Sequence, residues 1–111
     1  MNEIQLTAKI KVMIRREFPG VYVQRVSDKF LSGLPDLRVI CFGLSGDLEI
    51  KLPGKGKASR PSEIQEKVME WITAAGGSCA VAQSVDEARL WMHRLYIKGR
   101  AYHESRISQN S

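Results

Sequence analysis

The residues best suited to catalysis lie close together within residues 33–51. Asp36 follows a Gly-Leu-Pro tripeptide and precedes an apolar run, and Glu49 and Lys51 end the stretch with one residue between them. Side chains alternate between the two faces of a strand, so Glu49 and Lys51 share a face whose reverse side is apolar. Folding the apolar run back beside this second strand would bring Asp36 onto that same face.

The register between the two strands depends on a tight turn, which we expect within residues 43–46. A turn centred on the first two of these residues sets Asp36 opposite Lys51 and diagonal to Glu49. A turn centred on the last two moves Asp36 further away, so strand twist or a bulge has to close the gap. Both registers keep the three charged residues on one face.

These residue types suit metal-assisted hydrolysis. Two carboxylates held close together repel each other unless a cation neutralises them, and Mg²⁺ and Mn²⁺ prefer oxygen ligands and water. Asp36, Glu49 and the backbone carbonyl of Ile50 are therefore candidate ligands for such an ion. Lys51 can orient or deprotonate an attacking water, or offset the charge that gathers on phosphorus. The alternative is that Glu49 and Lys51 form only a solvated strand face with a surface ion pair, worth ~0–1 kcal/mol.

The elements that must position this stretch follow from apolar spacing and from capping signals. Asn2 with Gln5, and Ser62 with Gln65, match the capping box, in which a polar residue at the helix start pairs with a glutamine three residues later. The expected elements are a helix after Asn2 that ends at residues 18–20, strands at residues 21–26, 37–42 and 47–52, a helix from Ser62 to residues 76–77, a strand at residues 78–82 and a helix from Ser84 to about Lys98.

The order helix, three strands, helix, strand, helix predicts an α/β fold. We expect a three-layer sandwich with a four-stranded mixed β-sheet flanked by helices, because the last strand returns by a helical crossover and should lie parallel to its neighbour. One domain would span residues 1–97, and residues 98–111 would form a basic, polar and partly disordered tail. Trp71 and Trp91 lie on the apolar stripes of their helices, which favours the core. The apolar pair Phe30 and Leu31 could cover the core or contact a second subunit.

Composition narrows the class of protein and of partner. The chain has 111 residues, of which 43% are hydrophobic and 26% charged, as in ordinary globular domains. No apolar run is long enough to cross a bilayer and no secretion signal opens the chain, so we expect a soluble intracellular protein with no membrane partner. The net charge of +5 makes a polyanion such as nucleic acid a plausible partner. The loop at residues 53–61 carries three of the cations, Lys55, Lys57 and Arg60.

One set of residues resembles a known family. Gly33-x-Pro35-Asp36-Leu37, then Glu49-Ile50-Lys51, then Gln65 in a helix that Gly76-Gly77 ends, is similar to the VRR-NUC family of the PD-(D/E)xK nuclease superfamily. The resemblance extends from the first helix to about Leu95. It implies a restriction-endonuclease-like core and a Mg²⁺- or Mn²⁺-dependent endonuclease that hydrolyses DNA phosphodiester bonds.

The resemblance also implies roles for individual residues. Asp36 and Glu49 would bind the metal ion, Lys51 would serve catalysis and Gln65 would support the site. Glu3 matches an acid often found in the first helix of such nucleases and is a further candidate ligand. For Gln65 the alternative is helix capping alone, and for Glu3 it is a favourable acid in the first turn of a helix.

The loop cations Lys55, Lys57 and Arg60 would then bind neighbouring phosphates. The resemblance points to stand-alone viral or phage enzymes that act as homodimers on branched DNA such as four-way (Holliday) junctions, in the cytoplasm of a host cell if viral. Two rival interpretations stay open. One is a catalytically silent nucleic-acid-binding subunit with the same fold, and the other is a monomeric nicking nuclease that acts on duplex DNA.

Overall fold

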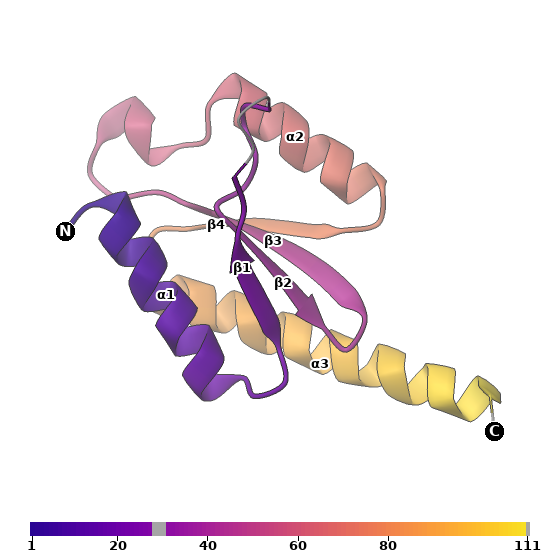
Figure 1. Cartoon of the computed structure of the whole chain (residues 1–111). Coiled ribbons are helices and arrows are strands. Elements are labelled where there is room, and N and C mark those ends of the chain that lie inside the picture. The colour runs from indigo at the N-terminus through magenta and orange to yellow at the C-terminus, as the bar shows by residue number, and fades with distance from the viewer. Residues whose placement is uncertain (28–30, 111) are drawn as a thin grey trace.

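The chain folds into an α/β sandwich, seen in a computed structural model that describes residues 1–27 and 31–110 (Figure 1). The elements occur in the predicted order, helix, three strands, helix, strand, helix. They are α1 (Glu3–Glu17), β1 (Tyr22–Arg25), β2 (Leu37–Cys41), β3 (Leu44–Ile50), the short 3₁₀ helix η1 (Gly56–Ser59), α2 (Glu63–Ala74), β4 (Ser78–Ala82) and α3 (Val85–Asn110).

The four strands form one mixed sheet in the order β1-β2-β3-β4. β2 pairs with β1 and β3, both antiparallel, and β4 lies parallel to β3. The parallel pairing is possible because α2 carries the chain back to the end of the sheet at which β3 begins. The predicted mixed sheet is therefore confirmed.

The hairpin between β2 and β3 differs from the expected one. Its two-residue turn is Phe42-Gly43, with φ of 52° and 91°, the positive values that tight hairpin turns require. The expected turn within residues 43–46 is therefore wrong, and β3 already begins at Leu44. Gly46 lies inside the strand because α3 packs closely on it, and a Cβ added there would lie 2.7 Å from the Trp91 ring. Its glycine serves close packing rather than a turn.

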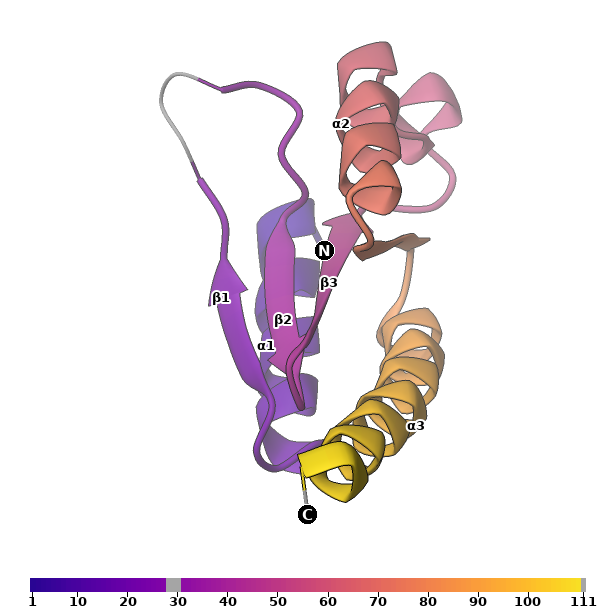
Figure 2. The same cartoon turned by 90° about the vertical axis from the view of Figure 1, so that its right-hand side faces the viewer.

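α1 and α3 cover one face of the sheet and form the main core with it (Figure 2). The apolar stripes of the two helices meet the alternate strand residues that point to this side, so the layer is continuous. The fully buried members of this core include Ile10, Ile14, Leu37, Val39, Leu48, Ile50 and Met92.

α2 covers the other face only in part, because it packs against β4 at one edge. Trp91 packs against the main core as predicted. The prediction of a core position for Trp71 is wrong, because this side chain is 60% exposed. It lines an apolar groove of about 320 Å³ with Leu31 and Ile64, where the loop before β2 meets α2. Phe30, paired with Leu31 in the sequence analysis, lies outside the described residues.

The C-terminal segment is helical rather than irregular. α3 continues through Asn110, so the expected partly disordered tail beyond Lys98 is wrong for the described residues (Figure 1). The reason is local packing at the β2–β3 turn, where the Phe42 ring contacts the rings of Tyr96 and His103 at centroid distances of 5.2 and 5.9 Å. Among the described residues no helix is both long and apolar enough to cross a membrane.

Candidate active site

The β2–β3 register brings the two predicted carboxylates together. Leu37 pairs with Leu48, and one further step along both strands sets Asp36 directly opposite Glu49. The backbone N–H of Val26 donates to the Asp36 carbonyl at 3.0 Å, and the N–H of Ile50 donates to Asp36 Oδ2 at 2.7 Å. Neither of the two expected registers occurs, and the observed one needs no bulge to close the gap.

The Gly-Leu-Pro tripeptide before Asp36 has a structural role. Gly33 adopts a φ of 81°, and a Cβ added there would lie 2.9 Å from the Ile64 carbonyl oxygen. Only glycine allows the loop to approach the start of α2 so closely. Pro35 is fully buried, which fixes the chain just before Asp36. The loop therefore delivers Asp36 to the site from the side of α2.

Glu49 is the centre of the site and is only 2% exposed. Its Oε1 accepts a hydrogen bond from Gln65 Nε2 at 3.1 Å and lies 3.8 Å from Lys51 Nζ. Its Oε2 is buried and has no hydrogen-bond partner in the part of the chain that the structure describes. The interpretation of a solvated strand face is therefore wrong for Glu49, because one of its oxygens is fixed and the other is buried and unused.

The electrostatics of this pair favour a bound cation. Burial, and next the neighbouring Asp36 carboxylate, raise the pKa of Glu49 from its ordinary 4.5 to about 8, and Lys51 opposes the shift. A divalent ion would offset this repulsion and supply the partner that Oε2 lacks. Within residues 1–27 and 31–110 no three His, Cys, Asp or Glu side chains converge on one point. Two carboxylates with water completing the shell suit Mg²⁺, so the residues present fit such an ion.

Gln65 joins the start of α2 to this pair. Its Oε1 accepts from the Ser62 N–H at 2.8 Å, and its own N–H donates to Ser62 Oγ at 3.3 Å, which completes the predicted capping box. The same side-chain amide donates to Glu49 through its nitrogen. The two alternatives for Gln65 are thus compatible, since one amide caps the helix and holds Glu49.

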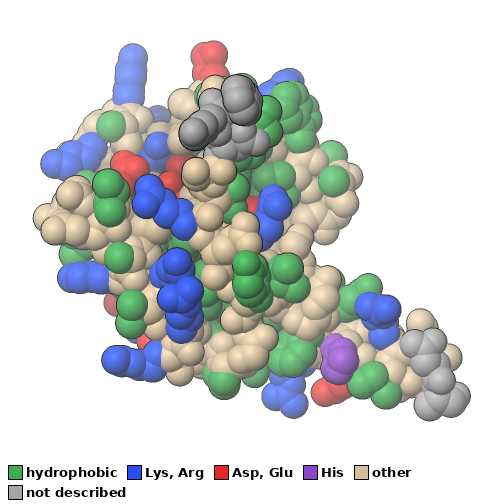
Figure 3. All heavy atoms as spheres, viewed as in Figure 1, with side chains coloured by type: hydrophobic (Ala, Val, Ile, Leu, Met, Phe, Trp, Pro, Cys, Tyr) green, Lys and Arg blue, Asp and Glu red, His purple; other side chains and the backbone are tan. Residues whose placement is uncertain are grey.

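A cleft of about 570 Å³ opens beside Lys51, between the start of α1, η1 and the start of α2. Glu3 lines it and contributes a small increase to the pKa of Glu49, so this acid faces the site without joining the Asp36–Glu49 pair. Lys57 and Arg60 line the same cleft. Figure 3 shows Lys and Arg side chains around acidic ones in this region.

The third loop cation is separate from the other two. Lys55 lines a groove on the other side of the loop with Met1, Lys9 and Gln83, and its N–H donates to Ser59 Oγ at 2.7 Å. The loop therefore turns two of the three predicted phosphate contacts towards the cleft. Lys55 offers a natural control for them.

One charged pair on this face was not predicted. Asp47 is 1% exposed, and its Oδ1 accepts from Arg38 Nε at 2.9 Å. Asp47 precedes Glu49 by two residues, so the period of two that linked Glu49 to Lys51 already places Asp47 on the same face. That signal was present in the sequence.

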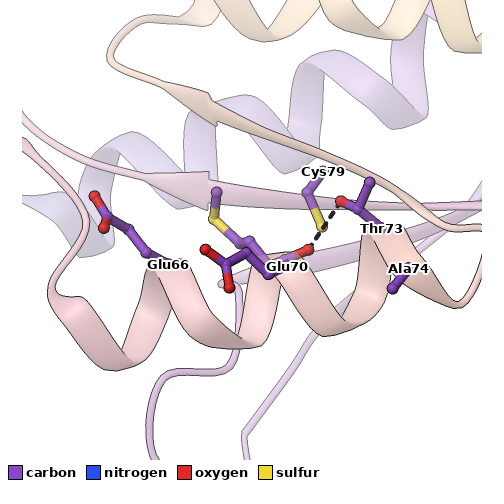
Figure 4. Close-up of a pocket in the computed structure, with 6 residues that line it drawn as sticks. Glu66, Glu70, Thr73, Ala74 and Cys79 are labelled. Carbon is purple, nitrogen blue, oxygen red and sulfur yellow. Dashed lines mark hydrogen bonds between the residues drawn. The ribbon is translucent and has the colours of Figure 1, made fainter.

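A second hollow of about 570 Å³ lies between α2 and β4 (Figure 4). Its lining includes Glu66, Glu70 and Cys79, and the Thr73 hydroxyl donates to the Met69 carbonyl at 2.8 Å on its wall. None of the predicted site residues lines it. Its two charged residues are glutamates, which makes it unsuited to DNA.

Comparison with known proteins supports the fold. No protein-family profile and no curated protein matches the chain in sequence. A solved structure described as a "VRR_NUC domain" superposes with a TM-score of 0.63 at 22% identity, over 78% of this chain and 94% of that one. A second, described as a "VRR_NUC domain protein", gives 0.67 at 21% identity, over 88% and 89%. The chain therefore has the fold of these VRR_NUC structures.

Proposed function

We propose that this protein is a Mg²⁺- or Mn²⁺-dependent endonuclease that hydrolyses DNA phosphodiester bonds. The observation that carries the proposal is the buried Glu49, set opposite Asp36, with one unused oxygen and Lys51 beside the other. A purely structural strand would gain nothing from two carboxylates at this position, because their repulsion destabilises the fold. The VRR_NUC fold and the net charge of +5 agree with nuclease action on DNA.

The roles of the residues follow from their contacts. Asp36, Glu49 and the Ile50 carbonyl would hold the ion, which when bound polarises a phosphate and makes water more acidic. Gln65 donates a hydrogen bond to Glu49 Oε1 and Lys51 forms an ion pair with the same oxygen, which leaves Oε2 for the ion. Lys51, whose side chain is mostly buried, would orient the attacking water or offset negative charge on phosphorus.

The cleft beside the site would bind the DNA backbone. Lys57 and Arg60 line it together with Lys51, so three cations face one opening. Cations arranged in this way bind successive phosphates and release counterions. Glu3 lines the same cleft and would bind a water of the ion rather than the ion itself.

We further propose that two copies act together on branched DNA such as a four-way junction. The surface assigned to their contact is the apolar groove of Leu31, Ile64 and Trp71, three large side chains exposed in one patch. An apolar patch of this kind can pair with the same patch of a second copy about a twofold axis. A dimer would present two sites to the paired strands of a junction.

The deciding experiment compares wild type, Asp36→Asn and Lys51→Ala on labelled junction and linear duplex, with Mg²⁺, Mn²⁺ or EDTA. We expect cleavage by wild type with either metal ion, none in EDTA and none by the two variants. Equal cleavage by wild type and Asp36→Asn would refute the metal site. DNA binding without cleavage in every condition would instead support the silent-subunit alternative.

The oligomeric state needs its own measurement. Light scattering of wild type and Trp71→Ser gives the mass of each in solution. A dimeric wild type and a monomeric Trp71→Ser variant are expected. A monomeric wild type that cuts one strand of a duplex would favour the nicking alternative.

A further inference from the structure

We propose that Arg38, held in place by the buried Asp47, binds the DNA phosphate next to the one that is cut. The proposal rests on the nuclease function proposed above and adds a residue to its substrate contacts. Arg38 would touch the substrate, and Asp47 would act through Arg38 as a positioning residue.

The placement of the pair comes from the strand register. Arg38 is paired with Asp47, two rungs from the Asp36–Glu49 rung in the β2–β3 ladder, with the Leu37–Leu48 rung between them. Because residues two apart on a strand point to the same side, Arg38 shares the face of Asp36 at a distance of about 6.6 Å along the strand. Neighbouring phosphates of a nucleic-acid strand are separated by a similar distance.

The geometry leaves the end of the guanidinium group available. Arg38 Nε donates to Asp47 Oδ1 at 2.9 Å, so the ion pair uses Nε and neither of the two terminal nitrogens. The structure gives these nitrogens no hydrogen bond to any residue within 1–27 or 31–110. The Arg38 side chain is 43% exposed, whereas that of Asp47 is 1% exposed. A fixed guanidinium with free terminal N–H groups is suited to bidentate contact with a phosphate.

The surroundings allow DNA to approach Arg38. α2 packs against β4, and in Figure 2 no helix of the described residues lies in front of β1 and β2. Tyr22 and Ile40, on the same face of these strands, are exposed. The open part of this face adjoins the site, so a strand of DNA held at Asp36 can continue across it.

Stability alone does not account for the pair. Burying a carboxylate is costly, and a buried ion pair can often be replaced by apolar residues with no loss of stability. Asp47 Oδ2 also lacks a partner among the described residues, which adds to the cost. A requirement for a fixed cation two rungs from the site, on the same face of the sheet, explains why such a pair is present.

The test measures binding of a fluorescent four-way junction and a linear duplex in EDTA, at several salt concentrations. Arg38→Ala should weaken binding about tenfold and lower the slope of log affinity against log salt by about one phosphate contact. Arg38→Met/Asp47→Leu, which replaces the ion pair with apolar residues, should melt at or near the wild-type temperature and bind as weakly as Arg38→Ala. Arg100→Ala, an exposed α3 arginine paired with Glu104, is the matched control and should bind almost as wild type.

The positioning role of Asp47 has a separate readout. Asp47→Asn should weaken binding roughly threefold in the wild-type background and should have no effect when Arg38 is already alanine, since coupled residues are non-additive. Wild-type affinity and salt slope in Arg38→Met/Asp47→Leu would overturn the proposal, because Arg38 would then serve only to neutralise Asp47. If wild type cleaves DNA and the Arg38 variants bind normally, this inference fails while the nuclease function stands. Absence of DNA binding by wild type would overturn both.

Discussion

The two faces of the β-sheet are built from the same strands but have different roles. On the α1–α3 face, apolar side chains such as Leu37, Leu48 and Ile50 form a continuous buried layer. On the α2 face, the alternate residues of β3 include two buried carboxylates, Asp47 and Glu49. One face stabilises the fold, and the other accepts a local cost in stability to hold charged groups in fixed positions. Substitutions of adjacent residues in one strand should therefore affect different properties, stability on one face and activity on the other.

The largest expected effect comes from the neighbours Leu48 and Glu49. Leu48→Ala leaves a cavity in a fully buried layer and should lower the free energy of unfolding by about 2–5 kcal/mol. Glu49→Gln should keep the fold and reduce cleavage at least about 100-fold, because it removes a charged metal ligand. Urea unfolding and junction cleavage, both measured for each variant, separate the two faces. Unfolding of Glu49→Gln at much lower urea would contradict the division of roles.

The stability of the protein should depend on pH through Glu49, on the charged face of the sheet. The folded-state pKa of Glu49 is about 8 against an ordinary 4.5, so the unfolded chain ionises first as the pH rises. The metal-free protein should therefore lose stability between about pH 4.5 and pH 8, by up to a few kcal/mol. Mg²⁺ should restore more stability at pH 8 than at pH 5, because it binds the ionised carboxylate.

Thermal melting at pH 5 and pH 8, in EDTA and in Mg²⁺, tests this expectation. Glu49→Gln serves as the control, since it cannot ionise and should show a flatter pH profile and little response to Mg²⁺. The electrostatic account of the site is untenable if wild type and Glu49→Gln have the same profile.

Most of the fold was predictable because local signals agreed. The capping boxes at Asn2 and Ser62, and the spacing of the apolar residues that follow, identified α1 and α2. Period-two alternation puts Glu49 and Lys51 on one face, and both expected hairpin registers put Asp36 on that face as well. These signals lie within short stretches of the chain, so they do not depend on what packs against them.

The predictions that were wrong concern features that depend on contacts between distant parts of the chain. Gly46 has the residue type of a turn glycine, but it lies in β3 because Trp91 packs closely on it. Phe42 lies in the turn, and its ring packs against α3. Trp71 is on an apolar stripe, but α2 sits at the sheet edge, so the stripe is wider than the surface it covers. Asp47 could have been found from its spacing to Glu49, whereas its burial required the structure.

The two capping boxes provide a smaller and more selective test. Gln65→Ala removes both a helix cap and the hydrogen bond to Glu49, so it should cost about 1 kcal/mol of stability and about 10–100-fold in cleavage. Gln5→Ala removes the equivalent cap at the start of α1 and should cost similar stability with unchanged cleavage. Equal cleavage by the two variants would mean that Gln65 serves the helix alone.

The smallest expected effect separates the two sides of the basic loop. Lys57 lines the cleft beside Lys51, whereas Lys55 lies in the groove on the other side, although both are exposed lysines two residues apart. Lys57→Ala should weaken DNA binding several-fold and reduce the salt slope by about 0.9, the value for one lost phosphate contact. Lys55→Ala removes the same charge and should change neither by as much. Binding titrations at three salt concentrations distinguish a defined path for the DNA backbone from attraction by net charge, because attraction by net charge alone predicts equal losses for the two lysines.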